Sequence, residues 1–88
     1  MAPSTVDLLQ SRLASLNPLS LAIDDESHRH AGHAGARDGG HYRVAIVAEV
    51  FSGRNTLARH RLVYDAAGDL MRERIHALSI HARAPDEV

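Results

Sequence analysis

The sequence RHRLVYDAAGDLMRERIHALSIHARA, residues 59–84, changes its hydrophobic period midway, and this change decides the fold. In its first half the apolar positions recur every three or four residues, as on one face of a helix. The stripe begins just upstream and comprises Leu57, His60, Val63, Tyr64, Ala67, Leu70 and Met71. Gly68 interrupts it, which predicts two short helices rather than one long helix. In the second half the apolar residues alternate, which predicts a strand with one face formed by His76, Leu78, Ile80 and Ala82.

The residues before this stretch predict one more helix and two more strands. Ser4 followed by Asp7 is typical of a capping box, and Asn17 and Pro18 should end the helix whose apolar stripe comprises Val6, Leu9, Leu13 and Leu16. A half-buried strand follows, in which polar or small residues alternate with Leu19, Leu21 and Ile23. A second strand begins at His41, with a buried face predicted to comprise Tyr42, Val44, Ile46, Ala48 and Val50.

The predicted order is therefore helix, strand, strand, helix, helix, strand, in one domain over residues 1–88. A crossover through the helix pair should bring the third strand parallel to the second. The expected fold class is α+β, with a three-stranded mixed sheet covered by helices.

Composition excludes several functional classes. An 88-residue chain buries only about 60 to 65 % of its unfolded surface, so no deep substrate cavity is expected. The sequence contains no cysteine, which excludes disulfides, thiol catalysis and a thiolate metal site made by this chain alone. Phosphate-binding, dinucleotide-binding and nucleophile-elbow motifs are also missing from the sequence, so we expect a protein that is not an enzyme and has no small-molecule substrate.

The net charge of −1 provides no general attraction to nucleic acid or to an anionic membrane. No apolar run approaches the roughly 18 residues of a membrane span, and the first residues do not resemble a secretory signal. A soluble chain in a reducing compartment, the cytoplasm, is the expectation.

Four of the seven histidines lie between Asp24 and Tyr42, in a stretch that also contains four glycines and is expected to be a long loop. Three of them, His28, His30 and His33, have a spacing that could hold zinc. A glycine-rich loop loses much conformational entropy when it fixes three ligands, so a dedicated zinc site is the weaker interpretation. His41 and His81 are expected to be exposed strand residues. His60 should be structural, with a hydrogen bond to one ring nitrogen.

Five segments together resemble the BolA family, from about Val6 to Pro85: DDESHRH, HYRVAIV, FSG, RHRLVY and IHAL. The most specific part is RHRLVY followed, eleven residues later, by HAL. The resemblance implies an αββααβ fold of the class II KH-like type. It also implies that the chain partners a monothiol glutaredoxin and shares a 2Fe-2S cluster with it.

By the same resemblance, His76 matches the cluster ligand at the start of the last strand. His30 matches a loop position that is histidine in one branch of the family and cysteine in another. The glutaredoxin cysteine and glutathione would supply thiolates, so the isolated chain should hold no stable cluster. From the residues alone, His76 could equally be a partly buried, hydrogen-bonded histidine in phase with Leu78 and Ile80, and His30 a solvated loop residue. His28 and His33 lie close enough to His30 to substitute for it.

The alternative function is nucleic-acid binding and transcriptional regulation. KH domains clamp an RNA backbone with a GXXG loop between helices, but the GHAG here, Gly32 to Gly35, lies between the first two strands. Phosphate contacts would instead come from Arg54, Arg59 and Arg61, the last two expected to project away from the apolar stripe.

Overall fold

A computed structural model describes residues 3–27 and 40–88 and has the predicted order of elements. Its helices are α1 (Thr5–Leu13), α2 (Thr56–Ala67) and α3 (Leu70–Glu73), and its strands are β1 (Ser20–Asp25), β2 (Gly40–Val47) and β3 (Ile75–Arg83). Short 3-10 turns are formed by η1 (Ala14–Leu16), η4 (Glu49–Phe51) and η5 (Pro85–Glu87). The strand order is β1-β2-β3, with β1 antiparallel and β3 parallel to β2, which confirms the predicted mixed sheet.

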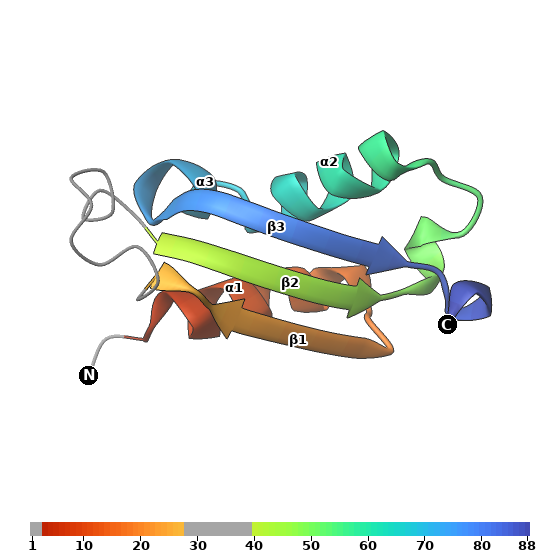
Figure 1. Cartoon of the computed structure of the whole chain (residues 1–88), viewed down its shortest axis with the longest axis horizontal. Coiled ribbons are helices and arrows are strands. Elements are labelled where there is room, and N and C mark those ends of the chain that lie inside the picture. Colours follow the sequence, from red (N-terminus) through yellow and green to blue (C-terminus); the bar gives the residue numbers. More distant parts are fainter. Residues whose placement is uncertain (1–2, 28–39) are drawn as a thin grey trace.

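Helices α1 and α2 pack on one face of the sheet and leave the other face open, as Figure 1 shows. Along β2 this arrangement produces strict alternation, in which Tyr42, Val44 and Ile46 are buried while Arg43 and Ala45 are exposed. Every helix and strand except β1 contributes residues to the buried core. The core comprises Leu9, Leu13, Tyr42, Val44, Ile46, Ala48, Phe51, Val63, Ala67, Leu70, Ile75, Ile80 and Ala84.

Side-chain caps start two of the helices, and the cap at Ser4 is one that the sequence predicts. The Ser4 hydroxyl oxygen accepts a hydrogen bond of 3.1 Å from the Asp7 backbone N–H and starts α1. The Asn55 side chain accepts one of 2.9 Å from the Ala58 N–H and starts α2. Helix α2 ends at Gly68, whose φ of 59° and ψ of −129° are strained for any residue with a Cβ. The predicted break at Gly68 is therefore confirmed.

Parts of the predicted apolar pattern are wrong. Leu57 and Tyr64 were expected to lie on the buried stripe of the helix, but they are 59 % and 40 % exposed. Val50 was expected to continue the buried face of the second strand, but β2 ends at Val47 and Val50 lies in η4. The chain turns at η4, where the Phe51 N–H donates a hydrogen bond of 3.2 Å to the Ala48 carbonyl and the side chain of Phe51 is fully buried.

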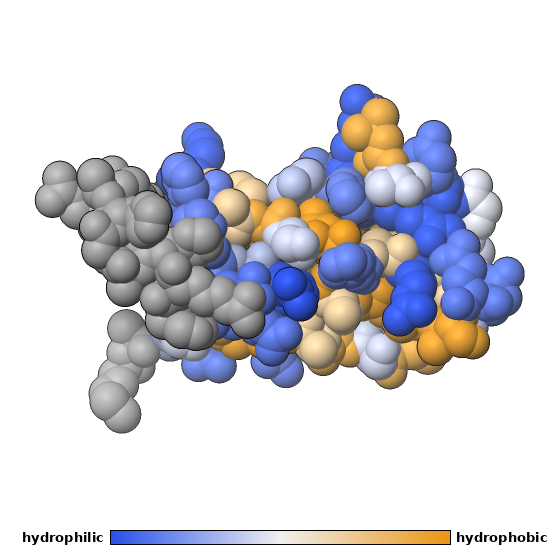
Figure 2. Space-filling view, viewed as in Figure 1, coloured by the Kyte–Doolittle hydropathy of each residue, from blue (hydrophilic) through white to orange (hydrophobic). Residues whose placement is uncertain are grey.

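The open face of the sheet is mostly small or charged. Figure 2, viewed onto this face, shows hydrophilic side chains interspersed with hydrophobic ones. The strand register places Ala22, Ala45 and His81 in one row across the three strands, beside a second row of Asp24, Arg43 and Ser79. None of the helices in the described part of the chain has the length and apolar character that a membrane span requires.

Candidate metal-ligating site

The start of β3 contains an extra residue, and that residue is His76. Gly40 pairs with Ile75 and the next residue, His41, pairs with Ala77, so His76 has no partner on β2. The burial pattern shows the same irregularity, because Ile75 and Leu78 both pack against the core although they are three positions apart. Strict alternation would place them on opposite faces. A β-bulge at His76 resolves the mismatch.

The bulge directs the His76 side chain into solvent. His76 is exposed, whereas Leu78 is half-buried and Ile80 is 9 % exposed. The prediction that His76 shares a face with Leu78, Ile80 and Ala82 is therefore wrong, and so is the alternative of a partly buried histidine. The physical reason is the inserted residue, which changes the phase of the strand between Ile75 and Leu78.

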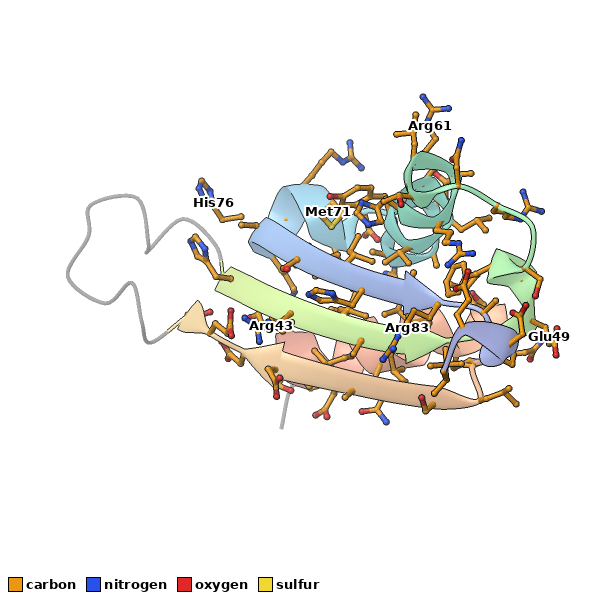
Figure 3. The ribbon with its side chains drawn as sticks, turned by 45° about the vertical axis from the view of Figure 1, so that its right-hand side comes forward. Arg43, Glu49, Arg61, Met71, His76 and Arg83 are labelled. Atoms are coloured by element: carbon orange, nitrogen blue, oxygen red, sulfur yellow. The ribbon has the colours of Figure 1, made fainter. Side chains whose placement is uncertain are left out.

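His41 lies beside His76 on the neighbouring strand. The two ring centroids are 5.2 Å apart with an angle of 43° between the ring planes. In Figure 3, His76 extends from the end of the sheet at which β3 begins. His41 is half-buried, so the expectation that it is simply an exposed strand residue is also wrong.

Hydrogen bonds fix the backbone around this pair. The His41 N–H donates to the Ser27 hydroxyl oxygen at 3.0 Å, and the His41 carbonyl accepts from the Glu26 N–H at 2.7 Å. The Gly40 N–H donates to the Arg74 carbonyl at 3.0 Å, just before β3 begins. The two imidazoles therefore come from adjacent strands whose main chains are held at this end of the sheet.

The other predicted metal ligand, His30, lies outside the described residues, as do His28, His33 and the GHAG segment. Within residues 3–27 and 40–88, no group of three or more histidine or carboxylate side chains is arranged to hold a metal ion. The described part of the site thus offers two imidazoles. Imidazole is a suitable ligand for iron, and two imidazoles leave coordination positions open for ligands from another molecule.

Of the three arginines of the predicted nucleic-acid patch, Arg59 is engaged in the fold. Its guanidinium makes a bidentate ion pair with Glu87, with Nη1–Oε1 and Nη2–Oε2 distances of 2.6 and 2.8 Å. It also donates to the carbonyls of Ala82 at 3.1 Å and Arg54 at 2.8 Å. The Arg59 side chain is only 12 % exposed, because these contacts hold it against the end of the described chain.

This ion pair perturbs both partners. The hydrogen bond from Arg59, followed by that from the Ala84 N–H, lowers the pKa of Glu87 from its usual value of 4.5 to about 2. The hydrogen bond with Glu87 raises the pKa of Arg59. Glu87 thereby joins the last turn of the described chain to the first turn of α2. Arg54 and Arg61 are exposed, and the Arg54 Nε–H donates to the Val50 carbonyl at 2.8 Å.

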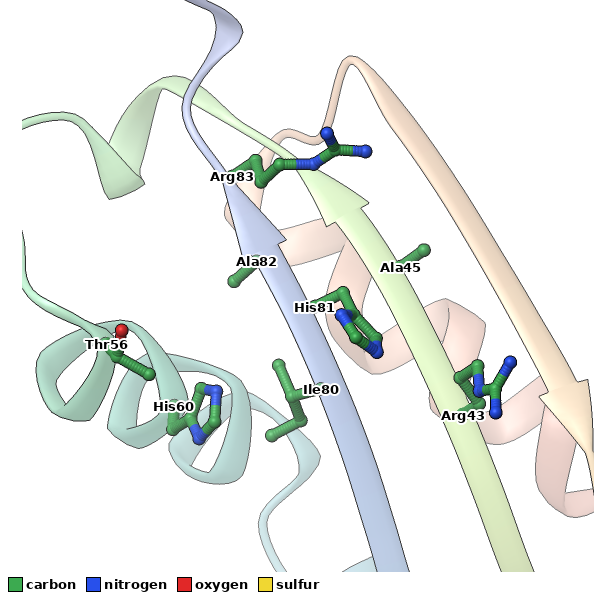
Figure 4. A pocket seen from close by; sticks show the side chains of 8 residues that line it. All are labelled: Arg43, Ala45, Thr56, His60, Ile80, His81, Ala82 and Arg83. Atoms are coloured by element: carbon green, nitrogen blue, oxygen red, sulfur yellow. The ribbon is translucent and has the colours of Figure 1, made fainter. Parts of the chain in front are cut away.

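A hollow of about 640 Å³ lies near the other end of β3. Figure 4 shows Thr56 and His60 on α2 facing β3, with His81 and Arg43 on the far side of that strand. His60 is half-buried here, and its ring makes no hydrogen bond with any described residue, contrary to the expectation. His81 is exposed as predicted. The hollow is lined by residues 80–83 of β3 and does not include His76.

Sequence reasoning missed His41. Its position was readable, because it begins the second strand one residue before the buried Tyr42 and so belongs to the open face. What the sequence did not reveal is the bulge, which brings His76 to the same face and beside it.

Comparisons with known proteins agree with this structure. The family model described as BolA-like protein matches residues 13–87. SufE-like protein 1, chloroplastic/mitochondrial, of Arabidopsis thaliana is 43 % identical over an alignment of 79 residues, and the match covers 83 % of this chain and 21 % of that protein. The DNA-binding transcriptional regulator BolA of Escherichia coli (strain K12) is 35 % identical over 68 residues, 77 % of this chain and 63 % of that protein.

Among solved structures, the BolA domain of SufE1 from Arabidopsis thaliana superimposes with a TM-score of 0.85 at 37 % identity, covering 100 % of both chains. The chain spans 21 %, 48 % and 50 % of the length of three curated relatives that it matches, so it corresponds to one part of those proteins. With the family model covering most of its length, the chain belongs to the BolA-like family.

Proposed function

We propose that this BolA-like chain is a non-catalytic adaptor that binds a monothiol glutaredoxin and contributes imidazole ligands to a shared 2Fe-2S cluster. Its role would be in trafficking of iron-sulfur clusters or in regulation by iron. The observation that supports this proposal most is the exposed ring of His76 on a bulge at the end of the sheet. Bulges often direct a functional side chain, and here the bulge turns a histidine away from the core into solvent.

The donor set determines what kind of partner is needed. A 2Fe-2S cluster takes four protein-type ligands, and histidine can replace cysteine on one of its irons. This chain has no cysteine, so both thiolates must come from other molecules. A glutaredoxin cysteine and glutathione supply them in the proposed complex. The cluster then lies between the two proteins, at the end of the sheet where His76 is accessible.

The test is to mix the chain with a cluster-loaded monothiol glutaredoxin and record visible absorption and circular dichroism. We expect a new spectrum for the heterocomplex, and we expect His76→Ala to abolish the change. His81→Ala is the matched control, because His81 is an exposed histidine on the same strand. An unchanged heterocomplex spectrum in His76→Ala would remove His76 from the ligand set. Recovery of a stoichiometric cluster on the pure chain, without partner or added thiol, would contradict the shared-cluster proposal.

A second candidate function is nucleic-acid binding, because a relative is named as a DNA-binding transcriptional regulator. The exposed arginines that support it are Arg54 and Arg61 on the α2 side, and Arg43 and Arg83 on the open face. Helices α2 and α3 are joined by two residues, Gly68 and Asp69, which leaves no room for a four-residue GXXG loop between them. Binding would therefore depend on phosphate contacts and weaken steeply with salt.

Location is a separate question. The names of two plant relatives give a chloroplastic or a chloroplastic/mitochondrial location for those proteins. The cytoplasmic location expected from the sequence therefore stays a prediction, to be checked by imaging of a tagged chain in its own cells.

A further inference from the structure

We propose that His41, and not a histidine of the loop, is the second imidazole ligand, and that His41 and His76 bind the same iron. This inference rests on the proposed function and assigns its ligands. Its starting observation is that the two rings lie 5.2 Å apart on adjacent strands.

The ring separation fits two imidazoles on one tetrahedral metal ion. With a metal–nitrogen bond of about 2.0–2.1 Å, each ring centre lies about 3.2 Å from the metal, and a tetrahedral angle then places the centres about 5 Å apart. The observed 5.2 Å agrees with this value. The separation of the rings is thus the one that two imidazoles on a common ion would have.

The pair is also ordered in advance. The backbone of His41 is hydrogen-bonded to Ser27 and Glu26, and His76 is flanked by the sheet-paired residues Ile75 and Ala77. A ligand on such a scaffold loses less conformational entropy on binding than one in a glycine-rich segment. His41 is therefore a ligand whose main chain the fold already holds in place.

The assignment defines the arrangement of the whole cluster. Two imidazoles from this chain occupy one iron, and two thiolates from the partner side occupy the other, as in Rieske centres. Because imidazole is neutral and thiolate is an anion, such a cluster is less negative than one with four thiolates. Its reduction potential should be correspondingly higher than that of the glutaredoxin cluster alone.

The test counts histidine nitrogens on the cluster. The chain is labelled with ¹⁵N-histidine, combined with unlabelled glutaredoxin, reduced, and studied by pulsed electron paramagnetic resonance. We expect two coupled histidine nitrogens in the unmodified chain, in His30→Ala and in the control His81→Ala, and one in His41→Ala. Loss of one nitrogen in His30→Ala with two retained in His41→Ala would overturn the inference while leaving the proposed function intact. A single coupled nitrogen in the unmodified complex would also overturn the inference and leave the proposed function intact. No coupled histidine nitrogen in any complex would refute the proposed function itself.

A second measurement does not depend on the cluster. In a variant with His28, His30 and His33 all changed to alanine, cobalt(II) is added to the isolated chain and ring signals are followed by nuclear magnetic resonance. We expect signals of His41 and His76 to shift together with one binding constant, and either His41→Ala or His76→Ala to weaken binding at least tenfold. Independent responses of the two rings, or binding that survives His41→Ala, would overturn the pairing. Amide spectra of each variant check that the fold is retained.

Discussion

Replacement of Gly40 by alanine should destabilise the protein through Tyr42. The ring of Tyr42 lies over Gly40, and a Cβ built on Gly40 would be 2.6 Å from the phenol Cζ and 2.5 Å from its oxygen. These distances are shorter than any normal contact, so the tyrosine ring must move. Tyr42 is only 7 % exposed, and the displaced ring would lose part of this burial.

The expected magnitude follows from two opposing effects. Full burial of a large apolar side chain contributes about 1.5–3 kcal/mol, and displacement of the ring should remove most of this. Alanine in a strand is otherwise favoured over glycine by about 0.5–1 kcal/mol. We therefore expect Gly40→Ala to lower the free energy of unfolding by about 1–2 kcal/mol.

Urea denaturation of a double-mutant cycle separates these effects. In Tyr42→Leu the shorter side chain no longer covers Gly40, so adding Gly40→Ala there should be neutral or stabilise by about 0.5 kcal/mol. The sign of the glycine substitution should thus reverse between the two backgrounds. Equal destabilisation in both backgrounds would refute the reasoning, because the loss of stability would then come from the backbone at residue 40 and not from the ring of Tyr42. A stabilising effect of Gly40→Ala in the unmodified chain would show that the ring moves at no cost.

Three further predictions concern α2 and its contacts. Glu87 has a lowered pKa of about 2, so its ion pair with Arg59 contributes stability above pH 4.5 that is lost as the pH falls toward about 2. Glu87→Gln should therefore flatten the pH dependence of unfolding in that window, and an unchanged acid titration would contradict the assignment. Gly68→Ala should cost about 1–3 kcal/mol in chemical denaturation because of its positive φ, and an equally stable variant would show that the backbone relaxes. If the chain binds DNA, Arg61→Ala should reduce the salt slope of binding in a fluorescence titration without changing the melting temperature, whereas Arg59→Ala should lower the melting temperature. Equal thermal stability of the two arginine variants would be contrary to the contacts seen here.

Much of the fold was predictable because its signals are local. Ser4 and Asn55 are capping residues, Gly68 has a backbone conformation that other residues avoid, and the alternation around Val44 marks a strand with one buried face. Each of these depends on a few neighbouring residues. The parallel pairing of β3 with β2 followed from the crossover between them.

The candidate site was less predictable because its geometry depends on how segments pair. The identity of His76 as a candidate came from the family resemblance, but its exposure depends on the bulge opposite Gly40 and His41. Similarly, nothing local to Arg59 reveals its ion pair, since Glu87 is 28 positions away. Leu57 and Tyr64 fit the helical period but are exposed, because a period identifies a face of a helix and not how much of that face the rest of the fold covers.

The bulge at His76 also has a consequence for protein engineering. If His76 were deleted, Ile75 would be followed directly by Ala77 and Leu78, and the strand would alternate regularly between the core and the open face. The histidine is thus a one-residue insertion in β3 that the packing of the core does not require. The deletion variant would lose the exposed imidazole and the bulge together, and would keep a regular strand. Other metal-binding side chains could be inserted at the same point without redesign of the hydrophobic interior.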